Sequence, residues 1–404
     1  MLKFNSASVR IADDSRAVDE CLSIMSGSEE PENGGLWIVN AVIGHKLEKV
    51  AAAIRARVPG AAVVGSSCGG VIGREGAGEA MTHLAVMTVH GPCDEYAWAG
   101  VDGFHAACAR QKGLELAGRL REKLPDARVI YLLTPGLDSC NDEVVACMEE
   151  VFGGNVLLFG GASSDNYKAL TTSQYCGDSS GISIAWAVGF ADKTLKASAR
   201  ATHGFNAFGD PMTVTAADHN QILELDGLPA WTAYNRNIGG LSEADAQVAL
   251  VTGGLAFPLP ADLAAEYGNK HLLRLGLPVE ETGAIRLSVS AKKGDLIYLT
   301  TRDEDLIFSE QQKALELLRR EIAARSEGGR IHPAAVFQTD CLLRGRTMFD
   351  KVVKDEIIGM LHNAFQNEGE TPPWLGMYGF GEFCPLGGQN LFHTYTTSLL
   401  VLYR

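Results

Sequence analysis

The fold is decided by the stretch Arg-Val-Ile-Tyr-Leu-Leu-Thr-Pro-Gly (128–136), which is followed by a helix-like segment and then by Val-Leu-Leu-Phe-Gly-Gly-Ala-Ser-Ser-Asp (156–165). Both runs are apolar enough to be strands covered on both faces of a sheet. Between them, apolar residues stand three or four positions apart, as in an amphipathic helix: Val144, Val145, Met148, Val151 and Phe152. This order predicts a crossover unit in a largely parallel or mixed sheet.

The same pattern occurs twice more along the chain. An earlier copy reads Gly-Gly-Leu-Trp-Ile-Val-Asn-Ala (34–41) and Ala-Val-Val-Gly-Ser-Ser-Cys-Gly-Gly (62–70), and a later copy reads Ala-Ala-Val-Phe-Gln-Thr-Asp-Cys (334–341) and Trp-Leu-Gly-Met-Tyr-Gly-Phe-Gly-Glu (374–382). A helical pattern precedes each copy, and a further strand follows each glycine-rich turn. We therefore predict an α/β fold of repeated helix-strand-helix-strand-strand units that form mixed sheets in two halves.

The region 190–300 has a different character, because short strand-like runs alternate with turns. The predicted strands are 193–202, 212–215, 249–252, 285–290 and 295–301. We interpret this region as a β-rich connection. The turn Asp-Gly-Leu-Pro (226–229) is a plausible boundary, which predicts one α/β domain over residues 1–225 and a second over residues 226–404.

Composition narrows the possible partners. The formal net charge is -14, from 35 basic and 49 acidic residues, which argues against a nucleic-acid or anionic-membrane partner. We find no apolar run of transmembrane length and no signal-peptide pattern, so we expect a cytoplasmic protein. The nine cysteines are scattered, which fits reduced thiols, and none stands at zinc-finger spacing, so we predict no structural metal site.

The three glycine-rich turns predict a ligand pocket, since open α/β sheets bind ligands beyond the carboxyl ends of their strands. Tight turning without a ligand is the alternative. We expect the pocket to lie between the two halves, because ligand sites favour such interfaces. The expected lining is Ser67, Cys68, Ser164 and Asp165 on one side and Asp340, Arg344, Tyr378 and Glu382 on the other.

Charged residues follow the strand of the third copy, namely Asp340, Arg344 and Arg346. A guanidinium holds a carboxylate through two parallel hydrogen bonds, and Asp340 or Glu382 would meet an ammonium group. The set would suit a zwitterion such as an amino acid. An internal ion pair that fixes the loop explains the same residues equally well.

We find no adequate catalytic constellation and expect that the protein is not an enzyme. Cys68 would need a base and an oriented partner, and no signature supplies them, so a cysteine-dependent activity is the remote alternative. Five histidines would be possible axial ligands if haem binds: His105, His203, His219, His332 and His393. The sequence does not choose among them, and no cofactor is predicted from the residues themselves.

The motifs resemble those of the FIST family of sensory proteins, in both its N-terminal and its C-terminal region. The matching pieces are Val-Val-Gly-Ser-Ser-Cys-Gly-Gly-Val-Ile-Gly (63–73), Val-Thr-Ala-Ala-Asp-His-Asn (214–220), Glu-Leu-Asp-Gly-Leu-Pro-Ala (224–230), Asp340-Cys341 with Arg344-Gly345-Arg346, Gly-Met-Tyr-Gly-Phe-Gly-Glu-Phe (376–383) and His393. The first turn differs from the family's usual alanine–glycine–glutamate, since it reads Cys68-Gly69-Gly70-Val71; the acidic residue occurs in the third turn, as Glu382.

The resemblance implies a cytoplasmic sensory module that binds a small ligand, such as an amino acid or another small polar metabolite. It also implies an alternative, because some stand-alone members are haem proteins that sense nitric oxide and act on a histidine kinase. We find no kinase, receiver or cyclase segment in this sequence, so we expect the output to pass through a separate signalling partner.

Overall fold

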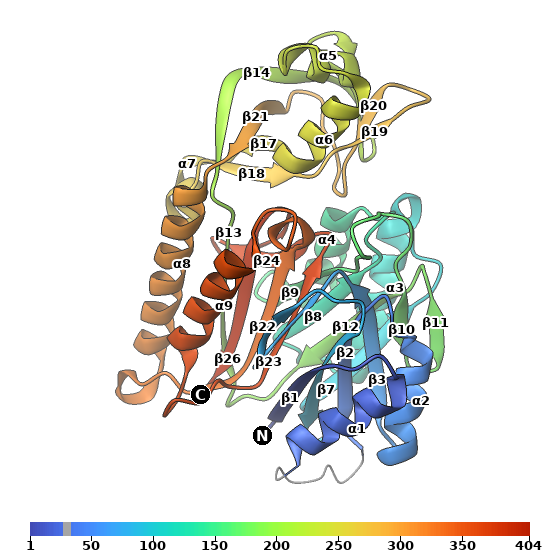
Figure 1. The fold of residues 1–404 in the computed structure, drawn as a ribbon, viewed down its shortest axis with the longest axis vertical. Coiled ribbons are helices and arrows are strands. Elements are labelled where there is room, and N and C mark those ends of the chain that lie inside the picture. The colour runs from blue at the N-terminus through green and yellow to red at the C-terminus, as the bar shows by residue number, and fades with distance from the viewer. Residues whose placement is uncertain (27–33) are drawn as a thin grey trace.

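Three six-stranded sheets and one eight-stranded sheet make up the computed structural model, which describes residues 1–26 and 34–404. The three smaller sheets form the lower body of the molecule, and the larger sheet lies above them with its own helices (Figure 1). The α/β fold of repeated units is confirmed. Within the described residues, no helix has the length and apolar character that a bilayer crossing needs.

The second unit shows the plan of all three. In chain order it contains β7 (Tyr96–Val101), α3 (Ala109–Lys123), β8 (Val129–Thr134), α4 (Asn141–Phe152), β9 (Leu157–Ala162) and β12 (Ala185–Phe190). Strands β8 and β9 are parallel, as the crossover helix α4 requires, and β12 runs antiparallel between β8 and β7. The leading strand β7 was not predicted, because its side chains are mostly half-buried and its sequence lacks the continuous run of large apolar residues that marks β8.

The other two units repeat this order. The first contains β1 (Lys3–Arg10), α1 (Asp14–Met25), β2 (Leu36–Val42), α2 (Leu47–Arg57), β3 (Ala62–Cys68) and β6 (His83–His90). The third contains β13 (Lys196–Thr202), α8 (Glu304–Arg325), β22 (Pro333–Cys341), α9 (Lys351–Phe365), β23 (Trp374–Gly379) and β26 (Thr397–Tyr403). The third unit is interrupted, because the chain enters the upper sheet after β13 and returns at α8.

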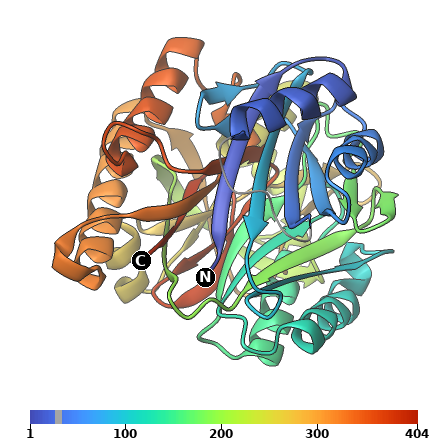
Figure 2. The same ribbon diagram turned by 90° about the horizontal axis from the view of Figure 1, so that it is seen from below.

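Each unit also sends a short hairpin into the sheet of another unit. Hairpin β4–β5 (Val71–Gly73, Gly76–Gly78) of the first unit pairs with β23 of the third. Hairpin β10–β11 (Gln174–Cys176, Ser179–Gly181) of the second pairs with β3 of the first. Hairpin β24–β25 (Glu382–Leu386, Gln389–His393) of the third pairs with β9 of the second. The exchange is cyclic and closes the three sheets around one centre (Figure 2).

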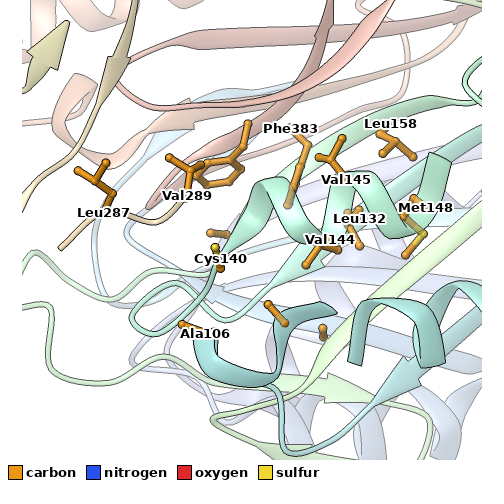
Figure 3. Packing of buried hydrophobic residues seen from close by; sticks show 14 of the residues in the cluster. Ala106, Leu132, Cys140, Val144, Val145, Met148, Leu158, Leu287, Val289 and Phe383 are labelled. Carbon is orange, nitrogen blue, oxygen red and sulfur yellow. The ribbon is translucent and has the colours of Figure 1, made fainter. Parts of the chain in front are cut away.

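The inner faces of the three sheets meet in a shared aromatic core. The Tyr131 ring of β8 lies 4.9 Å from the Phe337 ring of β22 and 5.8 Å from the Trp186 ring of β12, measured between centroids. The helices cover the outer faces and form separate apolar clusters with them (Figures 2 and 3). Burial on both faces explains why β2, β8 and β23 are buried along their whole length.

The eight-stranded sheet and its helices form the β-rich domain, which here means residues 205–302. Its elements are β14 (Phe205–Asp218), β15 (Gln221–Leu225), β16 (Leu228–Pro229), α5 (Ala230–Asn237), α6 (Glu243–Gly253), β17 (Leu255–Pro258), α7 (Ala261–Tyr267), β18 (His271–Arg274), β19 (Leu277–Val279), β20 (Ala284–Arg286) and β21 (Leu296–Arg302). All its strand pairs are antiparallel. The predicted boundary after residue 225 falls in the β15–β16 turn and stays a prediction.

The strand predicted over residues 249–252 is wrong, because these residues belong to helix α6. The Ser242 side chain caps the helix by accepting the Asp245 backbone N–H at 3.3 Å. Ala246 and Leu250 are buried on one helix face. Gly254, with a φ of 77°, ends the helix. A short apolar run does not by itself distinguish a strand from a buried helical turn.

A glycine in β9 provides a test of the unit architecture. Gly160 has a φ of 138°, and a Cβ built there would lie 2.0 Å from the Leu132 carbonyl oxygen. We predict that Gly160→Ala lowers the free energy of unfolding by about 2–4 kcal/mol, through strain and displacement of β8. Urea denaturation measures the change. Gly154→Ala is the matched control, since nothing lies within 4 Å of its Cβ; equal losses in both variants would contradict the assignment of strain to Gly160.

Candidate functional site

The turns that follow β3, β9 and β23 meet at the point where the three sheets join. We call residues 67–70, 162–165 and 378–382 the junction. Backbone N–H groups donate to carbonyl oxygens between the turns, in these pairs: Gly69 to Tyr378 at 3.1 Å, Tyr378 to Gly70 at 2.9 Å, Ser164 to Ser67 at 3.2 Å, Ala162 to Gly381 at 2.9 Å and Phe380 to Ala162 at 3.0 Å. Turns from far-apart segments are therefore one hydrogen-bonded structure.

Two serine side chains tie the junction together. The Ser67 hydroxyl donates to the Ser164 carbonyl oxygen at 2.8 Å and accepts the Ser173 N–H at 2.9 Å. The Ser164 hydroxyl donates to the Tyr378 carbonyl oxygen at 2.6 Å and accepts the Gly69 N–H at 2.8 Å. Both side chains are buried. Each hydroxyl thus serves as donor and acceptor inside the fold, so both serines stabilise the junction in this conformation.

Asp165 holds the loop that follows the second turn. Its carboxylate accepts four backbone N–H groups, from Lys168 and Ala169 at 3.0 Å each, from Leu170 at 2.7 Å and from Thr171 at 3.3 Å. The residue is 1% exposed. Charge-assisted bonds to four amides account fully for a buried aspartate, which gives Asp165 a structural role in this conformation.

Cys68 lies inside the apolar core between the sheets and is fully buried. Burial raises the pKa of the Cys68 thiol far above its ordinary value. A nucleophilic cysteine needs the opposite shift, toward the thiolate. The surroundings of Cys68 are therefore those of a packed core residue.

Three charged side chains of the third unit, which we call the charged cluster, are buried at or beside the junction: Asp340, Arg344 and Glu382, which are 3%, 2% and 0% exposed. Arg344 donates from Nη1 to the His203 carbonyl oxygen at 3.1 Å and from Nη2 to the Gln311 Oε1 at 3.0 Å. Full burial of charge is rare in proteins, and here Arg344 is held by neutral groups.

The two carboxyl groups of this charged cluster are also held by neutral partners. Asp340 Oδ1 accepts the Gln338 side-chain amide at 2.9 Å. Glu382 Oε2 accepts the Thr396 hydroxyl at 2.7 Å and the Thr396 N–H at 3.2 Å. Burial raises the pKa of Asp340 to about 6, although the Arg344 charge opposes the shift. Burial also raises the pKa of Glu382 well above its ordinary value.

Two polar atoms of the charged cluster lack a hydrogen-bond partner in the part of the chain that the structure describes. They are Oε1 of Glu382 and Nε of Arg344, and both are buried. An unsatisfied buried polar group costs about 1–3 kcal/mol, so such atoms are rare without a reason. Glu382 Oε1 accepts a hydrogen bond or, when the carboxyl group is protonated, donates one, and Arg344 Nε donates one. Within the three charged side chains these are the atoms that remain free to bind a molecule, and Nδ1 of His393, which pairs with Glu382 across β24 and β25, is a further buried atom nearby without a partner among the described residues.

The remaining predicted residues lie at the margin of the junction. Arg346 is exposed, donates to the Asn166 Oδ1 at 2.6 Å and stacks its guanidinium 4.3 Å from the centre of the Tyr167 ring. Its backbone N–H donates to Glu79 Oε1 at 2.9 Å. Glu79 in turn forms a buried ion pair with Lys354, a residue of α9. Sequence reasoning missed this pair, because nothing in either motif links a hairpin of the first unit to a helix of the third.

Tyr378 connects the junction with this ion pair. Its ring is buried, and a Cβ at Gly70 would lie 2.8 Å from its Cδ2 and 2.7 Å from the Glu79 Cγ. Gly70 therefore has no room for a side chain. Burial, followed by the nearby Asp340 charge, raises the pKa of Tyr378 well above its ordinary value. The phenol stays neutral between the charged cluster and Glu79.

Of the five candidate haem ligands, His203 and His393 pack against the same Tyr267 ring, with centroids 5.4 Å and 5.8 Å from it, and the other three lie elsewhere. His203 is buried, with Nε2 bonded to the His271 carbonyl oxygen at 3.0 Å and Nδ1 accepting the Phe205 N–H at 2.9 Å. His393 is buried with Nε2 bonded to the Cys384 carbonyl oxygen at 2.9 Å. The other three are exposed or half-exposed: His105, His219 and His332. Both ring nitrogens of His203 are occupied, so in this conformation it does not fit an axial ligand.

A cleft lies beside the charged cluster, between the third unit and the β-rich domain. It has a volume of about 340 Å³. Its lining combines the segment after Arg344 with α6 and β21: Ala249, Thr252, Gly253, Thr300, Thr301, Arg302, Leu343, Thr347 and Met348. The cleft does not include the charged side chains themselves, but the chain that carries Arg344 forms one of its walls.

Because Asp165 holds the loop over residues 168–171, a substitution at this position should destabilise that loop. We expect Asp165→Asn to lower the free energy of unfolding by about 2 kcal/mol, because a neutral amide replaces a carboxylate that accepts four N–H groups. Hydrogen exchange at residues 168–171 should accelerate as well. Asp94→Asn, at an exposed position, is the control. An unchanged exchange rate in this loop would show that the carboxylate does not hold it.

The raised pKa of Asp340 predicts a pH dependence. A carboxyl group whose pKa is higher in the folded protein stabilises the fold fully below the unfolded pKa, and the contribution is lost as the pH rises to the folded pKa. The pKa rises from 3.8 to about 6. Between about pH 4 and pH 6, Asp340 should therefore remove about 3 kcal/mol of stability.

Asp340→Asn isolates this contribution, because asparagine cannot ionise but keeps an oxygen that accepts the Gln338 amide. The variant should gain stability relative to the natural protein as the pH rises from 4 to 6, in urea titrations at several pH values. A difference that does not change with pH would contradict a raised pKa.

The geometry defines a class of protein. Its members have three α/β units that exchange hairpins, a β-rich domain inserted in the third unit, and a buried charged cluster where the three sheets join. The FIST N domain matches residues 36–228 and the FIST C domain matches residues 230–385. The chain belongs to the FIST family, whose domains are associated with sensory and signal-transduction proteins. The predicted resemblance is thereby confirmed.

Two of the curated relatives are named as uncharacterized proteins. An uncharacterized protein of Mycobacterium bovis is 30% identical over 206 residues, which cover 49% of this chain and 48% of that protein. An uncharacterized protein of Mycobacterium tuberculosis is 26% identical over 206 residues, 49% of each chain. The chain thus spans about half the length of the curated relatives it matches.

Solved structures with some similarity include a cyanuric acid hydrolase at 10% identity and a TM-score of 0.34, covering 100% of both chains. A cyanuric acid hydrolase from A. caulinodans has 9% identity and a TM-score of 0.30, over 75% of this chain and 100% of that one. Similarity at this level supports no conclusion about activity.

Proposed function

We propose that this chain is a sensory protein that binds a small polar ligand at Asp340, Arg344 and Glu382 and signals through a separate protein. The observation that carries the proposal is the pair of unsatisfied buried atoms, Glu382 Oε1 and Arg344 Nε. A ligand that bonded to both would remove the cost of leaving them without partners. Membership of the FIST family supports the sensory role.

The chemistry of the charged cluster favours a ligand with both an anionic and a cationic or donor group. The Arg344 guanidinium suits a carboxylate, because its N–H groups lie in one plane. The carboxyl groups of Asp340 and Glu382 suit an ammonium group, whose charge would lower their pKa values again. An amino acid or a similar small zwitterion satisfies both requirements.

Access to the charged cluster would come from the cleft of about 340 Å³, whose wall contains Leu343 and Thr347 on either side of Arg344. A ligand entering there would displace this segment and reach the guanidinium from the side of the β-rich domain. Pockets between domains commonly open in this way.

The connections of Arg344 support a route for the signal. Its two bonds reach His203, at the crossing from β13 into the β-rich domain, and Gln311, within helix α8 that follows the crossing back. Glu310, the neighbour of Gln311, accepts the Gly204 N–H at 2.8 Å, directly before β14. A ligand that draws Arg344 away from these partners would change how β14 and α8 hold the β-rich domain, and a partner protein would sense that change.

The cellular compartment of the protein is also part of this proposal. All nine cysteines are free, two of them exposed or half-exposed, which is typical of proteins in a reducing environment. We propose a cytoplasmic protein whose partner is a histidine kinase or another signalling protein, in line with the sensory role of the family.

Ligand binding predicts thermal stabilisation. The purified chain should be screened against the amino acids, small carboxylates and small amines. A ligand present at a hundred times its dissociation constant stabilises the native state by about 2.7 kcal/mol, a shift that thermal denaturation resolves. We expect at least one zwitterion to raise the melting temperature and simple carboxylates or amines to act more weakly.

Glutamine variants, which remove the charge, test the location. Glu382→Gln and Arg344→Gln should abolish the shift, whereas the exposed pair Glu316→Gln and Arg320→Gln should retain it. Calorimetry with the hit ligand would confirm the loss of affinity. If no compound shifts the melting temperature, or if the shift survives both cluster variants, the proposed site is wrong.

Haem binding is the second candidate function that the family resemblance implies, and the positions of the histidines in this conformation give it little support. None of the five candidate histidines lines the cleft beside the charged cluster, and His203 has no free ring nitrogen. An absorption spectrum of protein expressed with a haem supply tests it directly. A stoichiometric Soret band would replace the zwitterion proposal, and single histidine variants would then locate the ligand.

A further inference from the structure

We propose that Cys140, Glu143 and His219 form a binding site for a divalent transition metal, best suited to Zn²⁺, between the second unit and the β-rich domain. One ligand atom from each residue lies within 4.8 Å of the others: the cysteine sulfur, a carboxylate oxygen and an imidazole nitrogen. The site is separate from the charged cluster and does not depend on the proposed function.

Secondary structure places the three residues. Cys140 is the N-cap residue of α4, and Glu143 lies in the first turn of the same helix. Figure 3 shows Cys140 at the start of α4, near Leu287 and Val289 of the β-rich domain. His219 lies in the tight turn between β14 and β15, with a φ of 50°. Two rigid elements from different parts of the fold therefore supply the donors.

A connecting segment fixes the distance between these elements. The Asn141 N–H donates to the Ser288 carbonyl oxygen at 2.9 Å, and the Ser290 N–H donates to Asp142 Oδ1 at 2.9 Å. The Ala291 N–H donates to the His219 carbonyl oxygen at 2.8 Å. Residues 288–291 thus bridge the start of α4 and the histidine turn, so the three donors are held together by backbone bonds.

The donor set selects the metal. Thiolate, imidazole and carboxylate are the ligands of Zn²⁺, whereas Ca²⁺ and Mg²⁺ bind oxygen almost exclusively. Three protein ligands leave one tetrahedral position open, as in zinc sites that hold water or an exogenous ligand. Cys140 is buried, while the side chains of His219 and Glu143 are 35% and 27% exposed, so an ion can enter from the solvent side.

The existing contacts are compatible with metal binding. His219 Nε2 lies 3.4 Å from Glu143 Oε1, and the ion would replace this contact. Glu143 Oε2 accepts the Arg110 backbone N–H at 3.1 Å, and this bond orients the carboxylate so that Oε1 remains available to the ion. The Cys140 thiol donates to Asp142 Oδ1 at 3.3 Å; on metal binding this S–H bond breaks, the proton passes to water and a metal–sulfur bond forms in its place. The Ser290 hydroxyl, 3.6 Å from the sulfur, can then donate to the thiolate.

Metal binding would link the second unit to the β-rich domain. Cys140 and Glu143 belong to the body of three sheets, and His219 belongs to the domain above it (Figure 1). An ion that binds only the assembled site stabilises that assembly by mass action. The site would therefore fix the position of the β-rich domain relative to α4.

Cobalt provides a spectroscopic test with the full chain. After treatment with a chelator, the protein should bind about one equivalent of Zn²⁺ by elemental analysis. Co²⁺ should give intense tetrahedral d–d bands and a sulfur-to-cobalt charge-transfer band, and Zn²⁺ should remove both. The charge-transfer band should disappear in Cys140→Ser. His219→Asn should weaken Co²⁺ affinity by at least about tenfold. Asparagine is chosen because it tolerates a positive φ.

Matched controls keep the proposal falsifiable. Cys93→Ser and His332→Ala change exposed residues of the same types and should leave the cobalt spectrum unchanged. Circular dichroism of each variant establishes that it is folded. Failure of the natural protein to bind Co²⁺ or Zn²⁺, or a charge-transfer band that survives Cys140→Ser, would overturn the site and leave Glu143 and His219 as a surface ion pair.

Discussion

The structure depends on the cyclic exchange of hairpins among three sheets. Each glycine-rich turn must end one unit's parallel strand and then deliver a hairpin to the sheet of a neighbouring unit. Backbone N–H and carbonyl groups of the turns are paired across units, for example between Gly69 and Tyr378. Because buried backbone groups must be paired, no unit can complete its sheet alone. The three units therefore fold as one body, and the turns are fixed at its centre.

This constraint decides what the centre can contain. Ser67, Ser164 and Asp165 are occupied with holding turns together, so they are not free in this conformation. The side chains of Asp340, Arg344 and Glu382 are buried at or beside the bonded turns, where neutral partners leave Glu382 Oε1 and Arg344 Nε unsatisfied. A buried cluster of this kind is costly, and a ligand that completes its bonds would use the same free energy to bind.

The position of the β-rich domain would couple a ligand at the charged cluster to a change in that domain. The domain is inserted in the third unit, and Arg344 bonds to His203 at the crossing into the domain and to Gln311 within α8, the helix that follows the crossing back. On its other side the domain meets the start of α4, where the Cys140, Glu143 and His219 donors converge. The charged cluster and the proposed metal site thus contact the same domain from two directions, which would allow both to act on its orientation.

The sequence by itself determined the central elements of the repeat, namely helices α2, α4 and α9 and strands β2, β8 and β22, since apolar runs and helical spacing are local properties; it did not determine the leading strand β7. It also indicated Asp340, Arg344 and Glu382 through the motif they share with the FIST family. Only the tertiary structure decided the hairpin exchange, the pairing of Glu79 with Lys354 and the meeting of Cys140 with His219. Those contacts join residues far apart in the chain, and nothing in a local pattern specifies which distant backbone a short strand will pair with.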